Sequence, residues 1–489
     1  MPDRARCCPS RARCSSVPRS RPRWRRRRRG GPDERRPGVR VTTAAPDLQR
    51  LKHGPILPTL LRLAVPNVMA MAMTVAVGVA ETAYVGRLGT VPLAALALVF
   101  PFVMLIGMLS AGAMGGGVSS AISRALGAGQ AERARALAVH AVAIGAGAGV
   151  VHALLMLALG PVFYGWLGGR GPVLDEALRY ATIAFTGAPL MWLANTLASV
   201  LRGGGQMRVA SVAIIVTAVA QIALGALFAF GAGPLPAYGI AGVAGGQVAA
   251  SALGVALLWR GAASPAARLP LRFGGVRWQG ALCRDILKVG GVACISPLQS
   301  VLAVLICTGL VAHLGVAPLA GYSIGQRLEF MLIPIAFGIG VASVPMVGLA
   351  IGAGDVARAR RVAWTAGGLS ALNLALLGGG VALVPDAWAT LFTRDEGVLA
   401  HARDYLRVVG PAFPFFGLGL TLYFASQGSG RVLGPVLAGT VRLALVAGAG
   451  WWLVAHEAPP AGYFAMVAAG MVVYGLSTAA AVKLTRWGR

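Results

Sequence analysis

The segment GAGQAERARALA at residues 127–138 returns as GAGDVARARRVA at residues 352–363, with seven of the twelve positions identical. A second pair keeps nearly the same spacing, since LGTVPLA at residues 88–94 matches LGVAPLA at residues 314–320. Matches that stay in register over several segments indicate an internal duplication. We therefore expect two halves with the same fold, offset by about 225 residues.

The composition of the 489 residues is typical of a membrane protein. Hydrophobic residues make up 56% of the chain and charged residues only 12%, and the mean hydropathy is +0.71. Twenty of the 60 charged residues lie in the first 50 positions, so the remainder could not cover the surface of a soluble protein. A soluble multidomain enzyme is thereby excluded, and an integral membrane protein is predicted.

Twelve apolar runs are long enough to cross a bilayer, which takes a helix of about 20 residues. Six runs fall in each half of the duplication, so both halves enter the membrane in the same orientation, related by a pseudo-twofold axis along the membrane normal. The predicted fold is an all-α integral membrane protein with twelve transmembrane helices in two six-helix lobes. The predicted helices begin near Leu57, Leu93, Ala134, Leu174, Val209, Ile240, Ile286, Ala317, Val362, Ala400, Val432 and Ala461.

Basic residues divide the chain and predict its orientation. Residues 1–50 contain sixteen Arg and are predicted to form a disordered cytoplasmic tail, or to result from a mis-assigned start codon. The first lobe is expected at residues 51–260, a cytoplasmic linker at residues 261–284 and the second lobe at residues 285–489. Of the 28 Lys and Arg after residue 50, twenty lie on the tail's side. This bias predicts a multi-pass protein of the bacterial inner (plasma) membrane with both termini in the cytoplasm.

Several patterns that the sequence lacks narrow the function. It has no GxxxxGK[ST] loop for ATP, no CxxC or Cys/His spacing for a metal, and no His/Asp or Ser/His constellation within the spans for an enzyme. The net charge of +28 does not predict nucleic acid binding, because it lies in the tail and mostly on one membrane face. Parallel repeats enclose a substrate site between two lobes. We therefore predict a secondary transporter that needs no cofactor and no metal.

Several motifs resemble the multidrug and toxic compound extrusion (MATE) family, in its bacterial branch. They are the segment from Pro66 through ETAYVGRLGTVPLAAL, the loop LGAGQAERARAL, the turn VLRGGGQMR with its echo ASQGSGRVLGP, and the segments YGIAGVAGGQVA and QRLEFMLIPIAFG. The resemblance covers residues 57–485 and implies an antiporter with alternating access between the lobes. It would exchange H⁺ or Na⁺ for organic cations or lipophilic drugs, and we expect a monomer.

The resemblance also implies roles for single residues. Glu81 occupies the place of an acid that bacterial members often carry late in the first helix, just before T-x-x-V-G. Gln221 stands where helix 5 often has an Asn, and Gln247 replaces a helix-6 Thr. Some branches have acids in helices 7 and 10, where this chain has Gln299 and Phe416. These departures leave Glu81 as the main ion-coupling candidate and argue against a Na⁺ site with several oxygen ligands.

The free-energy cost of burying a charge also selects Glu81, independently of the family resemblance. Of the twelve acids after residue 50, only Glu81 and Glu329 lie well inside predicted helices. An acid inside the membrane is a functional candidate because burying its charge is expensive. Glu81 could instead lie near a helix end and reach the outer head groups. Glu329 shares its depth with Arg442 and Arg327, so we predict an ion pair in the second lobe, with a structural or a coupling role.

Neutral polar residues and a proline complete the candidates. Gln221, Gln247, Gln299 and Asn195 lie in the spans, where they either line the substrate cavity or only join helices by hydrogen bonds. Pro66 interrupts the first helix and is the candidate hinge, although a static bend is the simpler interpretation. Both questions depend on which way each side chain faces.

Two other transporter classes share parts of this pattern. A major facilitator also has two parallel six-helix repeats, but LGAGQAERARAL lacks the G-x-x-x-D-R-x-G-R-R pattern typical of its loop between helices 2 and 3. A lipid-linked oligosaccharide flippase of the same superfamily is the main alternative. Flippases usually have more helices and a basic cavity, whereas only Arg327 and Arg442 are bases within these spans. An exporting antiporter is the preferred prediction.

Overall fold

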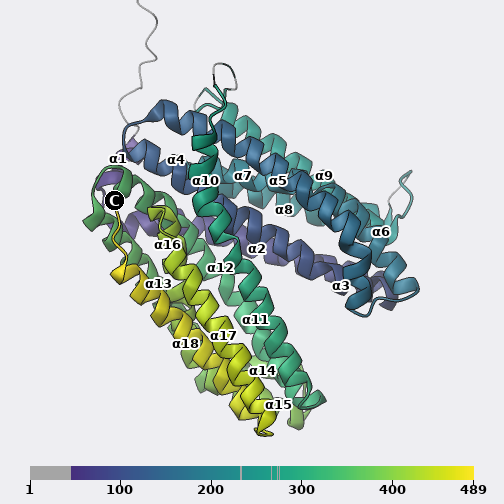
Figure 1. The fold of residues 1–489 in the computed structure, drawn as a ribbon. Helices are drawn as coiled ribbons and strands as arrows, with labels where there is room; N and C mark the ends of the chain where they lie inside the picture. Colours follow the sequence, from purple (N-terminus) through teal and green to yellow (C-terminus); the bar gives the residue numbers. More distant parts are fainter. Residues whose placement is uncertain (1–45, 232–233, 266, 273, 275, 489) are drawn as a thin grey trace, which may run out of the picture. The chain divides into compact units, whose positions relative to one another are not determined.

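A computed structural model describes residues 46–231, 234–265, 267–272, 274 and 276–488 as a set of α-helices (Figure 1). Over these residues the chain forms no β-strand. Eleven segments are long and apolar enough to cross a membrane, and the pair α6 and α7, bent by 44°, makes a twelfth. The predicted all-α fold with twelve membrane-spanning segments is confirmed.

The first half of the chain forms a short helix, α1 (Pro46–His53), and six spans. Two spans are interrupted, one by a π-helical turn, η1, and the other by the single residue Gly187. The spans are α2 (Ile56–Leu88), α3 (Thr90–Gly107) with η1 (Met108–Met114) and α4 (Gly115–Gly127), α5 (Ala131–Trp166), α6 (Pro172–Thr186) with α7 (Ala188–Gly203), α8 (Met207–Phe230) and α9 (Gly239–Ala263).

The second half repeats this arrangement with six more spans. A short helix, α14 (Asp386–Ala389), and a 3₁₀ turn, η2 (Gly410–Ala412), lie on either side of α15. The spans are α10 (Gly280–Ala293) with α11 (Ile295–Ala312), α12 (Val316–Gly352), α13 (Val356–Leu383), α15 (Glu396–Val409) with η2 and α16 (Phe413–Ser429), α17 (Leu433–Ala455) and α18 (Pro460–Leu484).

Equivalent glycines turn the chain at equivalent places in the two halves. Gly89 follows α2 with a φ of +127°, and Gly315 follows α11 with a φ of +108°. Gly205 and Gly430 have φ values of +81° and +78°. Side chains other than glycine rarely adopt these angles, so each glycine allows a turn too tight for another residue. The repeated sequence therefore produces a repeated backbone.

The duplicated GAG segments pack against each other where the two halves cross. A Cβ atom added to Gly127 would lie 3.0 Å from the Cα of Gly352, and one added to Gly352 would lie 2.9 Å from the backbone nitrogen of Ala128. Such close backbone approach is the usual role of small residues between membrane helices. Each copy of the motif thus supplies half of one symmetric contact.

Further bonds between the halves lie at the same end of the spans, which we call the Ile56 end after the first residue of α2. Asn67 donates its side-chain amide to the carbonyl oxygen of Gly338 at 3.2 Å, and the Ser120 hydroxyl donates to the carbonyl of Gln427 at 2.5 Å. Closer to the helix ends, Arg133 forms an ion pair with Asp285. A core cluster with buried side chains from both halves, including Leu60 and Val347, surrounds these contacts.

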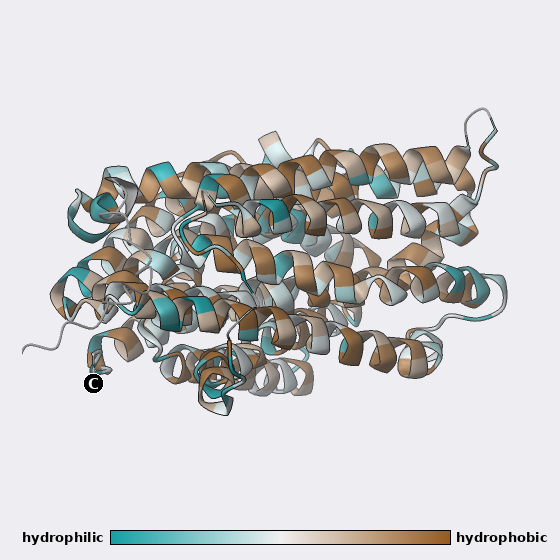
Figure 2. Ribbon diagram, turned by 90° about the horizontal axis from the view of Figure 1, so that it is seen from above, coloured by the Kyte–Doolittle hydropathy of each residue, from teal (hydrophilic) through white to brown (hydrophobic). Residues whose placement is uncertain are grey.

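The outer faces of the helices are apolar, as a lipid environment requires. Figure 2 shows hydrophobic residues along most of the helices and hydrophilic residues mainly toward their ends. Large apolar side chains such as Leu154, Leu376 and Val79 are more than half exposed, at 63%, 69% and 66%. A soluble protein rarely exposes so continuous an apolar surface. The chain is a multi-pass membrane protein.

The predicted boundary of the tail is wrong by a few residues. We expected disorder over residues 1–50, but helix α1 already begins at Pro46. It is held because Leu51 is only 3% exposed and Arg358 donates to the carbonyl oxygens of Leu51 and Gly54, at 3.4 and 2.6 Å. Residues 1–45 lie outside the described part of the chain.

The linker between the halves is shorter than predicted. We placed it at residues 261–284, but α9 continues to Ala263 and α10 begins at Gly280. The end of the linker is fastened to α5, because the backbone N–H of Gln279 donates to the His140 ring at 2.9 Å and the Trp278 ring stacks on it at 4.5 Å. The sequence missed this contact because its partners lie far apart along the chain.

Candidate functional site

The acid singled out by the sequence lies inside the first half. Glu81 is placed by α2, two turns before the helix ends, and is 7% exposed. The side-chain amide of Gln221, on α8, donates to its Oε1 atom at 2.8 Å. In the described part of the chain Glu81 has no ion pair with a base. The structure therefore brings the two predicted residues together and does not support an acid that reaches the head groups.

Tyr84 adds a second polar group that the sequence reading did not single out. It lies three residues after Glu81, so both are on one face of α2. Its hydroxyl is buried and has no hydrogen-bond partner among the described residues. A Cβ atom added to Gly225 of α8 would lie 3.1 Å from this hydroxyl oxygen, so the glycine leaves room for the phenol. The helical spacing from Glu81 was the signal that could have found it.

Two of the neutral polar candidates form hydrogen bonds between helices. Tyr180 of α6 donates to the Gln247 side-chain oxygen at 3.0 Å, and Gln247 is 2% exposed. Asn195 of α7 donates to the hydroxyl of Ser110, in the π-helical turn η1, at 2.8 Å. Such bonds hold membrane helices together. Gln247 and Asn195 therefore join helices in this conformation, and a role in binding substrate stays a prediction.

The ion pair predicted in the second half is not formed. Glu329, on α12, accepts a hydrogen bond from the hydroxyl of Tyr405 on α15. The Arg327 guanidinium lies over the ring of Phe392 at 5.1 Å. No ion pair within the described residues joins Glu329 to Arg327 or Arg442. A shared depth in the membrane was not enough to predict an ion pair, because the side chains point toward different neighbours.

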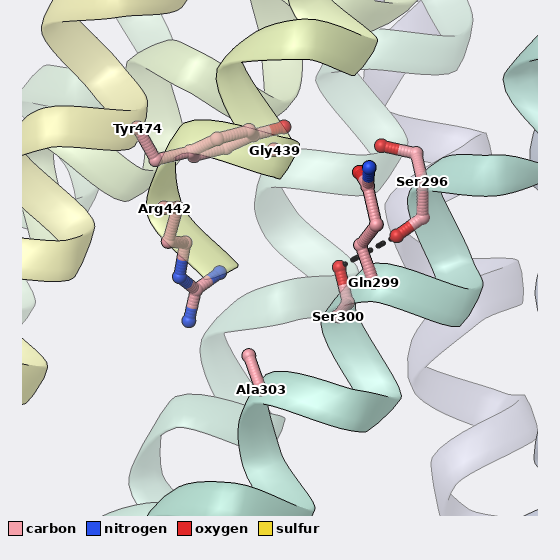
Figure 3. A pocket seen from close by; sticks show the side chains of 7 residues that line it. All are labelled: Ser296, Gln299, Ser300, Ala303, Gly439, Arg442 and Tyr474. Atoms are coloured by element: carbon pink, nitrogen blue, oxygen red, sulfur yellow. Dashed lines mark hydrogen bonds between the residues drawn. The ribbon is translucent and has the colours of Figure 1, made fainter. Parts of the chain in front are cut away.

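Arg442 instead lies in a pocket of the second half (Figure 3). Its guanidinium is 5.8 Å from the Phe416 ring and 5.9 Å from the Tyr474 ring. Gln299, the fourth neutral candidate, lines the same pocket from α11 and donates to the Thr440 hydroxyl at 2.7 Å. The structure thus places Gln299 with a base, and not with the acid of the first half.

The candidate hinge lies within a continuous helix. Pro66 is inside α2, which continues from Ile56 to Leu88. The residue after it, Asn67, is fully buried and bonded to Gly338 of the other half. A hinge at Pro66 would therefore act beside a contact between the halves, and hinge motion itself stays a prediction.

A duplicated bundle of twelve spans that holds an unpaired acid within one half has the architecture of a secondary active transporter. A family model described as MatE matches the chain twice, at residues 66–227 and at residues 293–452, once in each half. The chain belongs to the MATE family of efflux transporters. It handles small molecules, and the comparisons do not favour the flippase alternative.

Relatives of known name support this assignment. A protein of Shewanella oneidensis named FAD transporter is 25% identical over 82% of this chain and 88% of its own length. A probable multidrug resistance protein NorM of Thermotoga maritima is 25% identical over 77% of this chain and 81% of its own length. A solved MOP superfamily transporter from Pyrococcus furiosus, described as having a binding pocket of reverse polarity, gives a TM-score of 0.83 at 22% identity, over 91% of this chain and all of its own. The last comparison supports the fold alone.

Proposed function

We propose that this transporter is a secondary antiporter that exports organic cations or lipophilic drugs in exchange for H⁺, with Glu81 as the coupling group. The observation that carries the proposal is the buried carboxyl of Glu81, which accepts a hydrogen bond from the neutral amide of Gln221 and has no base as a partner among the described residues. An unbalanced carboxylate inside the membrane is expensive, so a proton or a cationic ligand stabilises it. One carboxyl cannot bind both at once, which is the requirement for antiport.

The surroundings of Glu81 support H⁺ over Na⁺ as the coupling ion. Gln221 presents its NH₂ group to the carboxyl, and this group donates and cannot bind a cation. Among the other acids of residues 51–260, Glu132 and Asp175 lie in the first turns of α5 and α6, and Glu176 forms an ion pair with Arg179. A single carboxyl is enough to take up a proton. The proposal involves no other cofactor and no metal.

Alternating access would follow from rocking of the two halves against each other, which would separate the crossing of Gly127 and Gly352 whenever that end opens. We place the Ile56 end in the cytoplasm, because most Lys and Arg outside the tail lie at that end. The bonds of Asn67 and Ser120 between the halves would then close the cytoplasmic side and break when it opens. The proposal places the chain in the bacterial plasma membrane, with both termini in the cytoplasm, as a monomer.

Ethidium efflux from proteoliposomes that contain the full chain tests this function. A pH gradient should drive transport, and a Na⁺ gradient without a pH difference should not. Glu81→Gln keeps the shape of the side chain but cannot titrate, so efflux should fall to background while the protein still folds. Glu132→Gln is the matched control, because Glu132 is an acid of the same half whose side chain is 80% exposed. Normal efflux by Glu81→Gln under a pH gradient would exclude the mechanism.

A further inference from the structure

The pocket around Arg442 has no role in the coupling mechanism described so far. It is a narrow, open hollow between α11, α17 and α18, with a cavity volume of about 10 Å³, so a ligand group larger than a water molecule would have to enter from its open side. Figure 3 shows Arg442 extending from α17 beside the face of α11 that carries Gln299, Ser300 and Ala303. Arg442 is the tenth residue of α17, about 15 Å along the helix, which is near the middle of the membrane.

The guanidinium of Arg442 has no polar partner among the described residues. It carries five N–H donors, but in the part of the chain that the structure describes it makes no hydrogen bond and no ion pair, and its Nε atom is buried. The guanidinium lies over the rings of Phe416 and Tyr474, whose faces attract its charge but offer no oxygen or nitrogen acceptor for its five N–H groups. An unpaired Arg at this depth is expensive, and such residues mark the path of a substrate or an ion.

Glu329, the acid inside the spans of this half, does not form an ion pair with Arg442. Glu329 is within electrostatic range of Arg442 but is bound by the Tyr405 hydroxyl. The other polar side chains that line the pocket are neutral, and two of them are the serines Ser296 and Ser300. The hydroxyl of Ser300 donates to the carbonyl of Ser296 at 3.0 Å and can turn toward a ligand, and Gly439 leaves room for Gln299. None of the residues that line the pocket is acidic, so it presents a positive charge and hydroxyl groups to a ligand.

We propose that this pocket binds an anionic group, a carboxylate or a phosphate, of the transported molecule. A guanidinium donates two parallel hydrogen bonds to such a group, and a low-dielectric site strengthens them. The inference rests on the proposed export function and names its substrate class more closely. Amphoteric molecules would place a cationic group near Glu81 in one step of transport and their anionic group on Arg442.

A matched pair of fluorescent dyes tests the pocket. One is a rhodamine with a free carboxylate, and the other is the methyl ester of the same dye, which keeps the cation but lacks the anion. Binding to the full chain in nanodiscs is measured by fluorescence polarisation. Arg442→Gln should lower the affinity for the free acid by about ten-fold or more, as expected for the loss of one charge-assisted contact. It should leave the affinity for the ester unchanged. Arg442→Lys should restore part of the affinity for the acid.

Arg394→Gln is the control, because it removes the same charge from an exposed position of the same half. The proposal is overturned if the wild-type protein does not bind the acid, or if Arg442→Gln leaves the affinity for the acid unchanged. It is also overturned if Arg442→Gln lowers the affinity for both dyes equally, because a purely structural role would have that effect. It is also overturned if added phosphatidylglycerol displaces the acid only when Arg442 is present, since the anion would then be a lipid. The two proposals can fail separately. If a pH gradient does not drive efflux of the ester but the acid still binds in an Arg442-dependent way, the export mechanism is rejected and the anion pocket stands.

Discussion

Tyr180 and Tyr405 occupy equivalent positions in the two halves, and both are buried, at 1% and 0% exposed. The first donates its hydroxyl to the amide of Gln247, whereas the second donates to the carboxyl of Glu329. The duplication has preserved the aromatic side chain and its place between helices. The residue on the neighbouring helix has changed, and with it the electrostatic character of the contact.

The charges inside the two halves differ in the same way. At the repeat spacing, Glu81 of the first half corresponds to Cys307 of the second, and Arg442 of the second half corresponds to Thr217 of the first. Thr217 only donates to the carbonyl oxygen of Ala213 in its own helix. A repeated backbone therefore does not impose a repeated site. Among the described residues, one half offers an acid without an ion pair and the other a base without one, so the two halves are suited to different groups.

The largest expected effect concerns what the halves still share. A Cβ atom at Gly127 or Gly352 meets backbone atoms of the other segment, which cannot move aside as a flexible side chain can. Gly127→Val and Gly352→Val should each destabilise the protein, by about 3 kcal/mol, the upper range for overpacking. Thermal unfolding of the purified chain measures the loss. Gly147→Val is the control, because a Cβ atom there has no neighbour within 4 Å.

Equal losses at Gly127 and Gly352 would confirm that the crossing is symmetric. Should Gly127→Val unfold at the same temperature as Gly147→Val, the two halves do not cross at these glycines.

A smaller effect should separate the equivalent tyrosines. Tyr405→Phe leaves a buried carboxyl without its donor, which costs about 2 kcal/mol, whereas Tyr180→Phe removes a bond between neutral groups and costs about 1 kcal/mol. Unfolding in denaturant compares the two variants. Combining Tyr405→Phe with Glu329→Gln is the control and should recover part of the loss, because the carboxyl is gone. Equal costs for both tyrosines would show that Glu329 does not distinguish the halves.

The smallest effect is expected between the two charges of the second half. Because Glu329 and Arg442 form no ion pair, their double-mutant cycle with leucine should give a coupling of no more than about 1 kcal/mol. A direct buried pair would instead give a coupling of about 3 kcal/mol, the top of the range for residues in contact. Unfolding of the two single variants and the double variant supplies the cycle. A coupling in the higher range would mean that the pair forms and that the pocket of Arg442 is already occupied.

The sequence alone determined the class, the number of spans and the duplication. Hydropathy depends on composition within a window, so the predicted start at Leu57 lies one residue from the observed Ile56, and the start at Ile240 lies one residue from Gly239. Repeated motifs are also visible without any structure. The cost of charge in the membrane was enough to select Glu81, because it depends on depth and not on the partner.

Only the tertiary structure decided the partners. Glu329 and Arg442 have a similar depth, yet one is bonded to Tyr405 and the other lies beside Phe416 and Tyr474. The rotation of each helix about its axis decides this, and a helix that is apolar on all sides carries little sequence signal for its rotation. Close approach of small residues such as Gly127 sets that rotation through packing. The depth of a charge is local information, whereas its neighbour is a property of the assembled bundle.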